Sequence, residues 1–362
     1  MKIIAALSAS ADAPFEIAEV ELDDPRSNEV LVQIKAVGVC HSDLTMKAVW
    51  PAEISPIVLG HEGAGVVVAV GSDVTATRPG DNVVLSYNSC GACPECSRGY
   101  RPYCRNFRIH NGIGTRPDGS STMRRQGSTV YGSYFGQSSF ASHALAYESN
   151  VVVVGDDIDL SLAAPLGCGI QTGAGTVLNV LRPAPDATLV VFGAGAVGLS
   201  ALMAAGAIGV AVIAVDPVAE RRALATRLGA DAALDPAADD VVGAIHQLTG
   251  GGAPYAIDTT AKGAVINQAI AALAPRGTLA VLGIGIPEFA LDMRGVISGG
   301  KTVRGVIEGD AVPHSFIPQL LALHADGELP IEELIRPYAF EDIDAAFADA
   351  ASGVAIKPVL LF

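Results

Sequence analysis

The chain has 362 residues, which is too long for one ordinary hydrophobic core and predicts about two domains. Half of the residues are hydrophobic and only 17% are charged, which indicates folded globular domains and not a disordered chain. The net charge is −15, from 23 basic and 38 acidic residues, and no basic block stands out, so we expect no nucleic-acid partner.

The first part of the chain predicts an all-β domain. The start imitates a signal peptide, but its apolar core, Ile3 to Leu7, has five residues where about 7–15 are needed. We therefore expect a cytoplasmic protein. Short strands such as Val30 to Val37 and Gly65 to Val70 follow, separated by turns rich in Gly and Pro.

Four cysteines are clustered at spacings typical of a structural zinc site. Cys90, Cys93, Cys96 and Cys104 stand in CGACPECSRGYRPYC, where glycines and a proline let a short loop fold back on itself. Four thiolates can then converge at roughly 2.3 Å from one ion. The alternative is two disulfides, which belong mainly to secreted proteins.

From about Gly169 the pattern changes to alternating strands and helices, which predicts a doubly wound parallel sheet. The uncharged stretch from Thr188 to Val215 has the length of a membrane span, but its glycines divide it into a strand, a helix and a second strand. We expect no membrane segment. The expected strands are Leu189–Phe192, Val210–Val215, Ala256–Asp258 and Thr278–Gly283, and the expected helices follow Gly195 and cover Ala219–Leu228 and Val265–Leu273.

The C-terminal part is expected to return to the first domain. It contains a helical segment, Ile317 to His324, then Phe340 to Ala351, and a terminal strand, Lys357 to Phe362. On pattern alone, two consecutive domains stay an alternative.

The string GAGAVG, at positions 193 to 198, predicts a dinucleotide site because it follows a buried strand and opens a helix. The pyrophosphate then binds at the helix N-terminus. Asp216 ends the second strand, where a carboxylate accepts hydrogen bonds from ribose hydroxyls and repels a 2′-phosphate, so NAD is favoured over NADP. Arg221 and Arg222 could pair with such a phosphate, or lie on a solvated helix face.

A second metal set comes from distant positions. Cys40 stands in CHSD, His61 in GHEGAG and Cys168 in PLGCGIQTGAG. Two thiolates and one imidazole leave the fourth position of a tetrahedral zinc open to substrate, which is typical of a catalytic site. Taken singly, each could instead be a buried core residue.

With both metal motifs and the nucleotide string, the chain resembles the medium-chain zinc-dependent alcohol dehydrogenases over essentially its full length. Strings such as GVCHSDL and YFGQSSFA look most like the aryl- or benzyl-alcohol dehydrogenase branch. The resemblance implies a GroES-like β-rich catalytic domain over residues 1–169, with the zinc lobe at about 88–106. It further implies a Rossmann domain over 170–307 and a return to the catalytic domain over 308–362.

The resemblance also implies roles for single residues. Ser42 begins a proton relay, Asp43 orients His61, and Glu62 lies behind the metal as an occasional ligand. Thr45 stands where well-known members carry the histidine at the outer end of the relay, so the route of the proton stays open. The implied cofactor residues are His41, Gly193, Gly195, Ala196, Val197, Gly198, Asp216, Arg221, Ile284 and Lys357, with His41 and Lys357 at the pyrophosphate. The implied substrate pocket consists of Trp50, Tyr87, Tyr134, Phe135, Ile284 and Ile307.

The expected function is therefore an NAD-dependent alcohol dehydrogenase with two zinc ions per chain, which interconverts primary aromatic or allylic alcohols and aldehydes. One alternative is a dehydrogenase of S-hydroxymethyl thiol adducts, and a remoter one is a non-enzymatic zinc and dinucleotide redox sensor. The resemblance also implies a homodimer or homotetramer, formed through the strand near Lys301 to Val306.

Overall fold

The computed structural model describes residues 1–285 and 288–362 and divides into two compact units. The first unit comprises Met1–Cys168, Val312–Leu321 and Glu332–Phe362, and the second comprises Gly169–Ala311 and Ala322–Ile331. The chain thus comes back to the first unit after the second, with a short stretch of the returning segment, Ala322–Ile331, belonging to the second unit. The domain limits given above stay our prediction.

Two β-sheets build the first unit, as the short-strand pattern indicates. One sheet has the order β4-β1-β2-β7-β8, and the other has the order β10-β6-β5-β3-β18-β17 with β9 paired to β3. All of these pairs are antiparallel except β17 with β18. The strands are β1 (Lys2–Ser8), β2 (Glu16–Leu22), β3 (Glu29–Gly38), β4 (Ile57–Val58), β5 (Glu62–Val70), β6 (Asn82–Leu85), β7 (Met123–Arg125), β8 (Ser128–Val130), β9 (His143–Tyr147), β10 (Val151–Val154), β17 (Ile335–Ala339) and β18 (Lys357–Leu361).

The C-terminal strand completes the larger sheet. Val359, Leu360 and Leu361 pair with Gly38, Val37 and Ala36 of β3, so the last residues lie beside a strand from the start of the chain. Val37 and Leu360 are fully buried in one apolar core. Burial of such side chains contributes about 1.5–3 kcal/mol each relative to exposure. This pairing is what brings Lys357 into the first unit.

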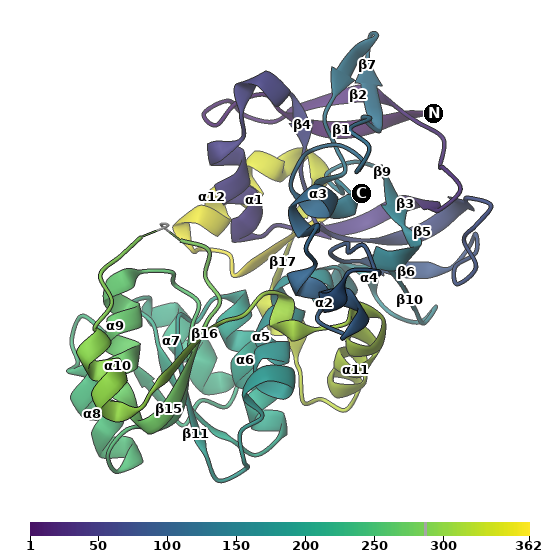
Figure 1. Ribbon diagram of the computed structural model, residues 1–362. Helices are drawn as coiled ribbons and strands as arrows, with labels where there is room; N and C mark the ends of the chain where they lie inside the picture. Colours follow the sequence, from purple (N-terminus) through teal and green to yellow (C-terminus); the bar gives the residue numbers. More distant parts are fainter. Residues whose placement is uncertain (286–287) are drawn as a thin grey trace. The chain divides into compact units, whose positions relative to one another are not determined.

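Short helices connect the strands of this unit, and α12 lies beside α1 in Figure 1. The helices are α1 (His41–Val49), α2 (Pro94–Ser97), α3 (Phe107–Asn111), α4 (Leu160–Ala163), α11 (Pro313–Ala325) and α12 (Ile343–Ser352). Of these, α11 crosses from the first unit into the second at Ala322.

The second unit is a parallel six-stranded sheet in the order β13-β12-β11-β14-β15-β16. In chain order this is 3-2-1-4-5-6, the doubly wound arrangement of dinucleotide-binding domains, so the predicted fold class is confirmed. The strands are β11 (Thr188–Phe192), β12 (Ala211–Val215), β13 (Ala232–Leu234), β14 (Ala253–Asp258), β15 (Leu273–Val281) and β16 (Thr302–Gly305). The helices are α5 (Gly169–Gly175), α6 (Ala196–Ala207), α7 (Ala219–Arg227), α8 (Val241–Thr249), α9 (Gly263–Ala272) and α10 (Met293–Gly299).

The long uncharged stretch becomes β11, α6 and β12, as its glycines predict. Of the part of the chain that the structure describes, no helix has both the length and the apolar character needed to cross a membrane. The predicted boundary between α9 and β15 is wrong, because Leu273 begins β15 and does not end α9. The expected strand Thr278–Gly283 therefore starts too late, and it also ends after Val281, where β15 ends.

Candidate metal centres and cofactor site

The four clustered cysteines face one another in the geometry of a metal site. The sulfur atoms are 3.4 Å apart for Cys90 and Cys104, 3.5 Å for Cys93 and Cys96, 3.9 Å for Cys90 and Cys96, and 4.0 Å for Cys93 and Cys104. A tetrahedral zinc with bonds of about 2.3 Å places its sulfur ligands about 3.8 Å apart. A disulfide requires about 2.05 Å, and all six cysteines of the chain are free thiols. The disulfide alternative is therefore excluded, and the residues fit zinc.

The lobe also favours the deprotonated form of one cysteine, Cys93. The backbone N–H groups of Cys96 and Arg105 point to Cys93 and lower the pKa of its thiol to about 6. Metal ligands must be deprotonated, so this cysteine is ready to bind zinc near neutral pH.

The second metal set assembles entirely within the first unit. Cys40 precedes α1, His61 precedes β5, and Cys168 ends the first segment of the unit. The ligand atoms of these residues and a carboxylate oxygen of Glu62 all lie within 4.8 Å of one another. His61 is fully buried, and its Nε2 has no hydrogen-bond partner among the described residues. A buried, orphaned ring nitrogen beside two thiols fits a zinc ligand.

Asp43 positions two of these three residues. Its Oδ1 is 2.9 Å from His61 Nδ1 and accepts a 3.2 Å hydrogen bond from the backbone of Gly60, and its Oδ2 accepts a 3.0 Å bond from the backbone of Cys40. Burial disfavours a charged imidazole, but the Asp43 carboxylate outweighs it and raises the pKa of His61 well above its usual value. With Nδ1 donating to Asp43, Nε2 is the nitrogen left for metal.

Lys357 lies at the back of this set. Its ammonium is 2.8 Å from both carboxylate oxygens of Glu62 and donates to the Val39 carbonyl at 3.3 Å. Both side chains of this ion pair are buried, and although burial opposes the charge, Glu62 raises the pKa of Lys357. In the structure the lysine neutralises Glu62, because a buried carboxylate needs a cation. Its reach to a pyrophosphate stays a prediction.

The relay residues lie on the first turns of α1. Ser42 Oγ is 3.8 Å from Cys40 Sγ, so the hydroxyl is beside the metal set. Thr45 is three residues farther along the same helix, on the same face, and is exposed. His41 is also exposed.

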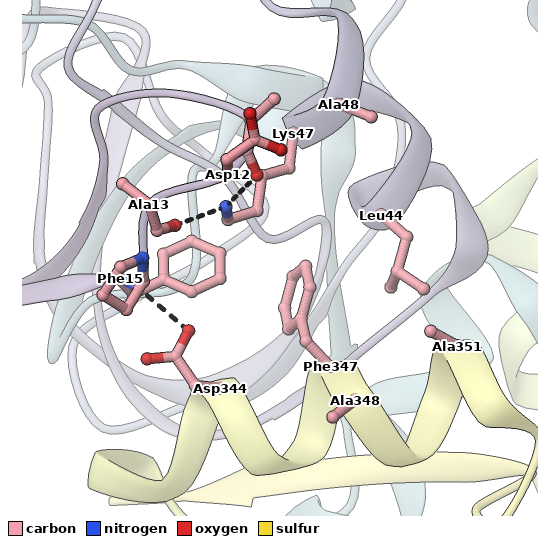
Figure 2. A pocket seen from close by; sticks show the side chains of 12 residues that line it. Asp12, Ala13, Phe15, Leu44, Lys47, Ala48, Asp344, Phe347, Ala348 and Ala351 are labelled. Atoms are coloured by element: carbon pink, nitrogen blue, oxygen red, sulfur yellow. Dashed lines mark hydrogen bonds between the residues drawn. The ribbon is translucent and has the colours of Figure 1, made fainter.

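The far end of α1 is held by a separate contact. Lys47 donates to the carbonyls of Ser10, Ala11 and Ala13 at 3.2, 2.8 and 2.7 Å. It lines a cavity of about 560 Å³ together with Phe15 and Phe347, which Figure 2 shows between the N-terminal loop, α1 and α12. None of the candidate metal ligands lines this cavity. The Lys47 hydrogen bonds therefore hold the end of α1 and do not contact the metal set.

Two aromatic rings lie beside His61. The ring centroid of Phe135 is 4.6 Å from that of His61, and that of Tyr134 is 5.5 Å from it. Phe107 lies 6.2 Å from Phe135 and 6.0 Å from Tyr87, which links the predicted pocket residues into one cluster. Phe107 was not among the predicted pocket residues, and its position three residues after Cys104 is the one signal in the sequence that could have indicated it.

The other predicted pocket residues are placed differently. Trp50 donates its indole N–H to the Ile54 carbonyl at 2.7 Å and packs against Gly114. Ile284 and Ile307 belong to the second unit and are 78% and 44% exposed. They stay predictions for the pocket.

The three glycines of the nucleotide loop fit their predicted uses. Gly193 has φ +97°, which a side chain rarely adopts, and a Cβ on Gly198 would lie 1.9 Å from the Gly193 carbonyl. A Cβ on Gly195 would meet open space, so the backbone there is free to approach a ligand. The loop lies between neighbouring β11 and β14, which is the switch point of the sheet, and α6 begins at Ala196 with its free N–H groups. These residues fit a dinucleotide pyrophosphate.

Asp216 binds the backbone of the glycine-rich loop. Its carboxylate accepts hydrogen bonds of 2.8 Å from the backbones of Ala194 and Val218, and the side chain is buried. Arg222 pairs with Asp235 at 2.8 Å and donates to the Asp216 carbonyl, while Arg221 lies 3.9 Å from the Asp216 carboxylate. The expectation of a solvated arginine face is wrong, since these side chains are only 18% and 19% exposed. Each arginine thus lies beside a carboxylate, Arg221 beside Asp216 and Arg222 beside Asp235.

Comparisons with known proteins agree with this geometry. Residues 26–156 match the family model of the alcohol dehydrogenase GroES-like domain, and residues 196–326 match that of the zinc-binding dehydrogenases. The chain is similar to the geraniol dehydrogenase of Castellaniella defragrans, with 45% identity over 99% of this chain and 97% of the relative. It is also similar to the crystal structure of benzyl alcohol dehydrogenase from Acinetobacter calcoaceticus, with a TM-score of 0.96 and 40% identity over 100% of this chain and 99% of that one. The S-(hydroxymethyl)glutathione dehydrogenase of Paracoccus denitrificans is 32% identical over the whole of both chains. The chain belongs to the medium-chain zinc-dependent alcohol dehydrogenases and is an oxidoreductase that acts on alcohols.

Proposed function

We propose that the chain oxidises primary allylic or aromatic alcohols to aldehydes with NAD, and that each chain holds two zinc ions. Cys40, His61 and Cys168 bind the catalytic zinc, and the four-cysteine lobe binds the other. The observation that carries the substrate class is the ring of Tyr134 and Phe135 against His61, extended by Phe107 and Tyr87. The similarity to dehydrogenases of geraniol, an allylic alcohol, and of benzyl alcohol supports the same class.

The residues of the site divide the chemistry among them. Bound zinc supplies a Lewis acid that lowers the pKa of the alcohol hydroxyl. Ser42 Oγ accepts the hydroxyl proton, and Asp43 holds His61 in the tautomer that leaves Nε2 for metal. Two thiolates and a neutral imidazole would balance the double charge of a bound zinc ion, so the site would not hold the aldehyde product by a net positive charge. The loop from Gly193 to Gly198 would hold the pyrophosphate of NAD, and the bound cofactor would supply the hydride acceptor.

The proton leaves Ser42 along α1. Thr45 presents a hydroxyl one turn farther, on the exposed part of the helix, and can pass the proton to water. A histidine is therefore not needed at this position.

A thiol-adduct dehydrogenase is the nearest alternative, since one relative of that activity is 32% identical. Such a substrate carries anionic groups and needs cations around it. The aromatic cluster offers none, and Lys357 is paired with Glu62. Formaldehyde oxidation assayed with and without a small thiol separates the two functions. Rapid NADH formation from benzyl alcohol excludes a redox sensor without enzymatic activity.

The substrate class predicts a large preference for flat apolar alcohols. Each buried CH₂ equivalent contributes about 0.8 kcal/mol, so benzyl or cinnamyl alcohol should exceed ethanol by roughly two decades or more in kcat/KM. The measurement compares benzyl alcohol, cinnamyl alcohol, geraniol, ethanol and a secondary alcohol under one set of conditions, followed by NADH absorbance. Higher kcat/KM for ethanol or the secondary alcohol would contradict the aromatic pocket and leave the family assignment intact.

The cofactor preference depends on Asp216. Removing a hydrogen bond to a charged group costs about 1.5–3 kcal/mol, so Asp216→Ala should lower kcat/KM for NAD by roughly 10- to 100-fold and narrow its advantage over NADP. Asp235→Ala is the companion variant, because it releases Arg222 from its 2.8 Å ion pair and should raise NADP use while NAD use persists. Equal use of both cofactors by the parent enzyme would contradict this assignment.

We also propose that the protein is cytoplasmic and forms homodimers or homotetramers through β16. β16 is the last strand in the order of the parallel sheet, so one side of its backbone is open to pairing, and all four of its residues are exposed. Sedimentation measures the subunit number directly.

A further inference from the structure

Gln137 makes an unusual set of contacts around the residue that follows His61. Its Nε2 donates to the His61 carbonyl at 2.9 Å, and its Oε1 accepts from the Gly63 backbone at 3.1 Å. These two peptide groups stand on either side of Glu62, so one buried amide holds both. The side chain is 2% exposed and therefore cannot exchange these bonds for water.

The same amide continues to the turn that carries Cys168. Gln137 Nε2 also donates to the Ser86 carbonyl at 3.1 Å. Ser86 Oγ in turn donates to the Gly167 carbonyl at 2.6 Å, and that peptide group leads directly into Cys168. Ser86 is fully buried and directly follows β6. Two side chains thus connect the backbone at His61 to the backbone at Cys168.

Local sequence makes room for this connection. A Cβ on Gly63 would lie 2.3 Å from Ser139 Oγ and 3.1 Å from Gln137 Oε1, so only glycine lets the amide come this close. Ser139 Oγ itself donates to Gln137 Oε1, and Asn150 Nδ2 donates to the Ser86 carbonyl at 3.0 Å. Both polar atoms of the Gln137 amide therefore have partners, and a flip of the amide would place its oxygen against two carbonyls. These contacts fix the orientation of the amide.

We propose that Gln137 and Ser86 are positioning residues for the catalytic metal, and we call the pair the Gln137–Ser86 frame. Asp43 fixes His61 relative to Cys40, and the frame fixes His61 relative to Cys168. Neither side chain of the frame contributes a ligand atom to the metal set. The frame acts through the ligand-bearing backbone, and its loss removes the Gln137 amide from the His61 carbonyl and the Ser86 hydroxyl from the Gly167 carbonyl.

The inference rests on the proposed zinc site of Cys40, His61 and Cys168. The metal content of the parent enzyme tests that site first. If the parent binds no metal there, the proposed function fails; if the parent binds it and the frame variants hold it equally well, only the frame fails.

The test measures metal loss and metal geometry in four variants. Gln137→Met keeps the volume of the side chain and removes its bonds, whereas Gln137→Glu keeps the acceptor for Gly63 but sets an oxygen against two carbonyls. Ser86→Ala removes the bond to Gly167, and the fourth variant combines Gln137→Met with Ser86→Ala. Val20→Ala, a truncation of a buried β2 residue in the same unit, controls for general loss of stability. Cys168→Ala identifies which phase of metal release belongs to the catalytic set.

Partners that orient metal ligands typically change metal affinity or activity by 10- to 100-fold, so each single variant should release this metal to a chelator roughly 10- to 100-fold faster than the parent. The cobalt-substituted protein should show a changed absorption spectrum, and kcat should fall more than KM rises. The double variant should be less than additive, because both changes interrupt one connection. Release rates and cobalt spectra equal to those of the parent and of Val20→Ala would overturn the proposal, as would full additivity. If Gln137→Met does not fold, Gln137→Glu and Ser86→Ala carry the same test.

Discussion

Cys168→Ala should abolish alcohol oxidation while the protein stays folded. The substitution removes one of the three proposed protein ligands of the catalytic zinc, and the remaining thiolate and imidazole no longer form a closed three-ligand set. Cys168 belongs to neither of the two large apolar clusters, so the substitution should leave both of them intact. The zinc content measured by elemental analysis should fall from two ions per chain to one. Activity should be below detection in the NADH assay.

Cys93→Ser is the matched control, because it also removes one zinc ligand but from the four-cysteine lobe. Its effect should appear mainly as a lower midpoint of thermal unfolding, since structural zinc contributes directly to folding. Residual activity per folded molecule should persist at the temperature where the variant is still folded. Active parent protein with fewer than two zinc ions per chain, or an active Cys168→Ala variant, would contradict the assignment of the two sites.

The parallel sheet could be predicted from the sequence because each of its parts carries a local signal. Buried strands such as Leu189–Phe192 are nearly uniform in apolar residues, and the GAGAVG string fixes where the first strand ends and the helix begins. The short strand β13 and helix α8 were not predicted. Ala232–Leu234 is only partly buried and short, so no pattern separates it from a loop. The boundary between α9 and β15 was predicted wrongly for a similar reason, because apolar residues continue from the helix through Leu273 into the strand.

The metal ligands could be predicted because cysteine and histidine chemistry is visible residue by residue. Contacts made by residues without metal-binding chemistry could not be predicted from the sequence. Phe107 reads as a core aromatic and Gln137 as a loop residue, and only the fold brings them to Tyr87 and to the His61 backbone. Arg222 shows the opposite error, because a charged residue on a helix suggests a solvated face until Asp235 of a neighbouring strand end is seen to pair with it.

Ser42→Ala should lower kcat for alcohol oxidation by about 10² to 10⁴, the usual contribution of a positioned proton acceptor. Ser42 Oγ lies 3.8 Å from Cys40 Sγ at the start of α1, which places the hydroxyl beside the proposed metal set without making it a ligand. Zinc content and NAD binding should therefore stay at parental values. The measurements are steady-state kinetics with benzyl alcohol, elemental analysis and a fluorescence titration with NADH.

Ser42→Thr is the control, because it keeps a hydroxyl at the same position on α1 and should retain far more activity than the alanine variant. A second variant, Thr45→Ala, asks whether the proton continues along the helix and should have a smaller effect, since water reaches that exposed position directly. If Ser42→Ala stays within about twofold of the parent, water or Thr45 accepts the proton in its place. If instead the variant loses zinc, the hydroxyl acts through Cys40 and its effect on catalysis is one of metal placement.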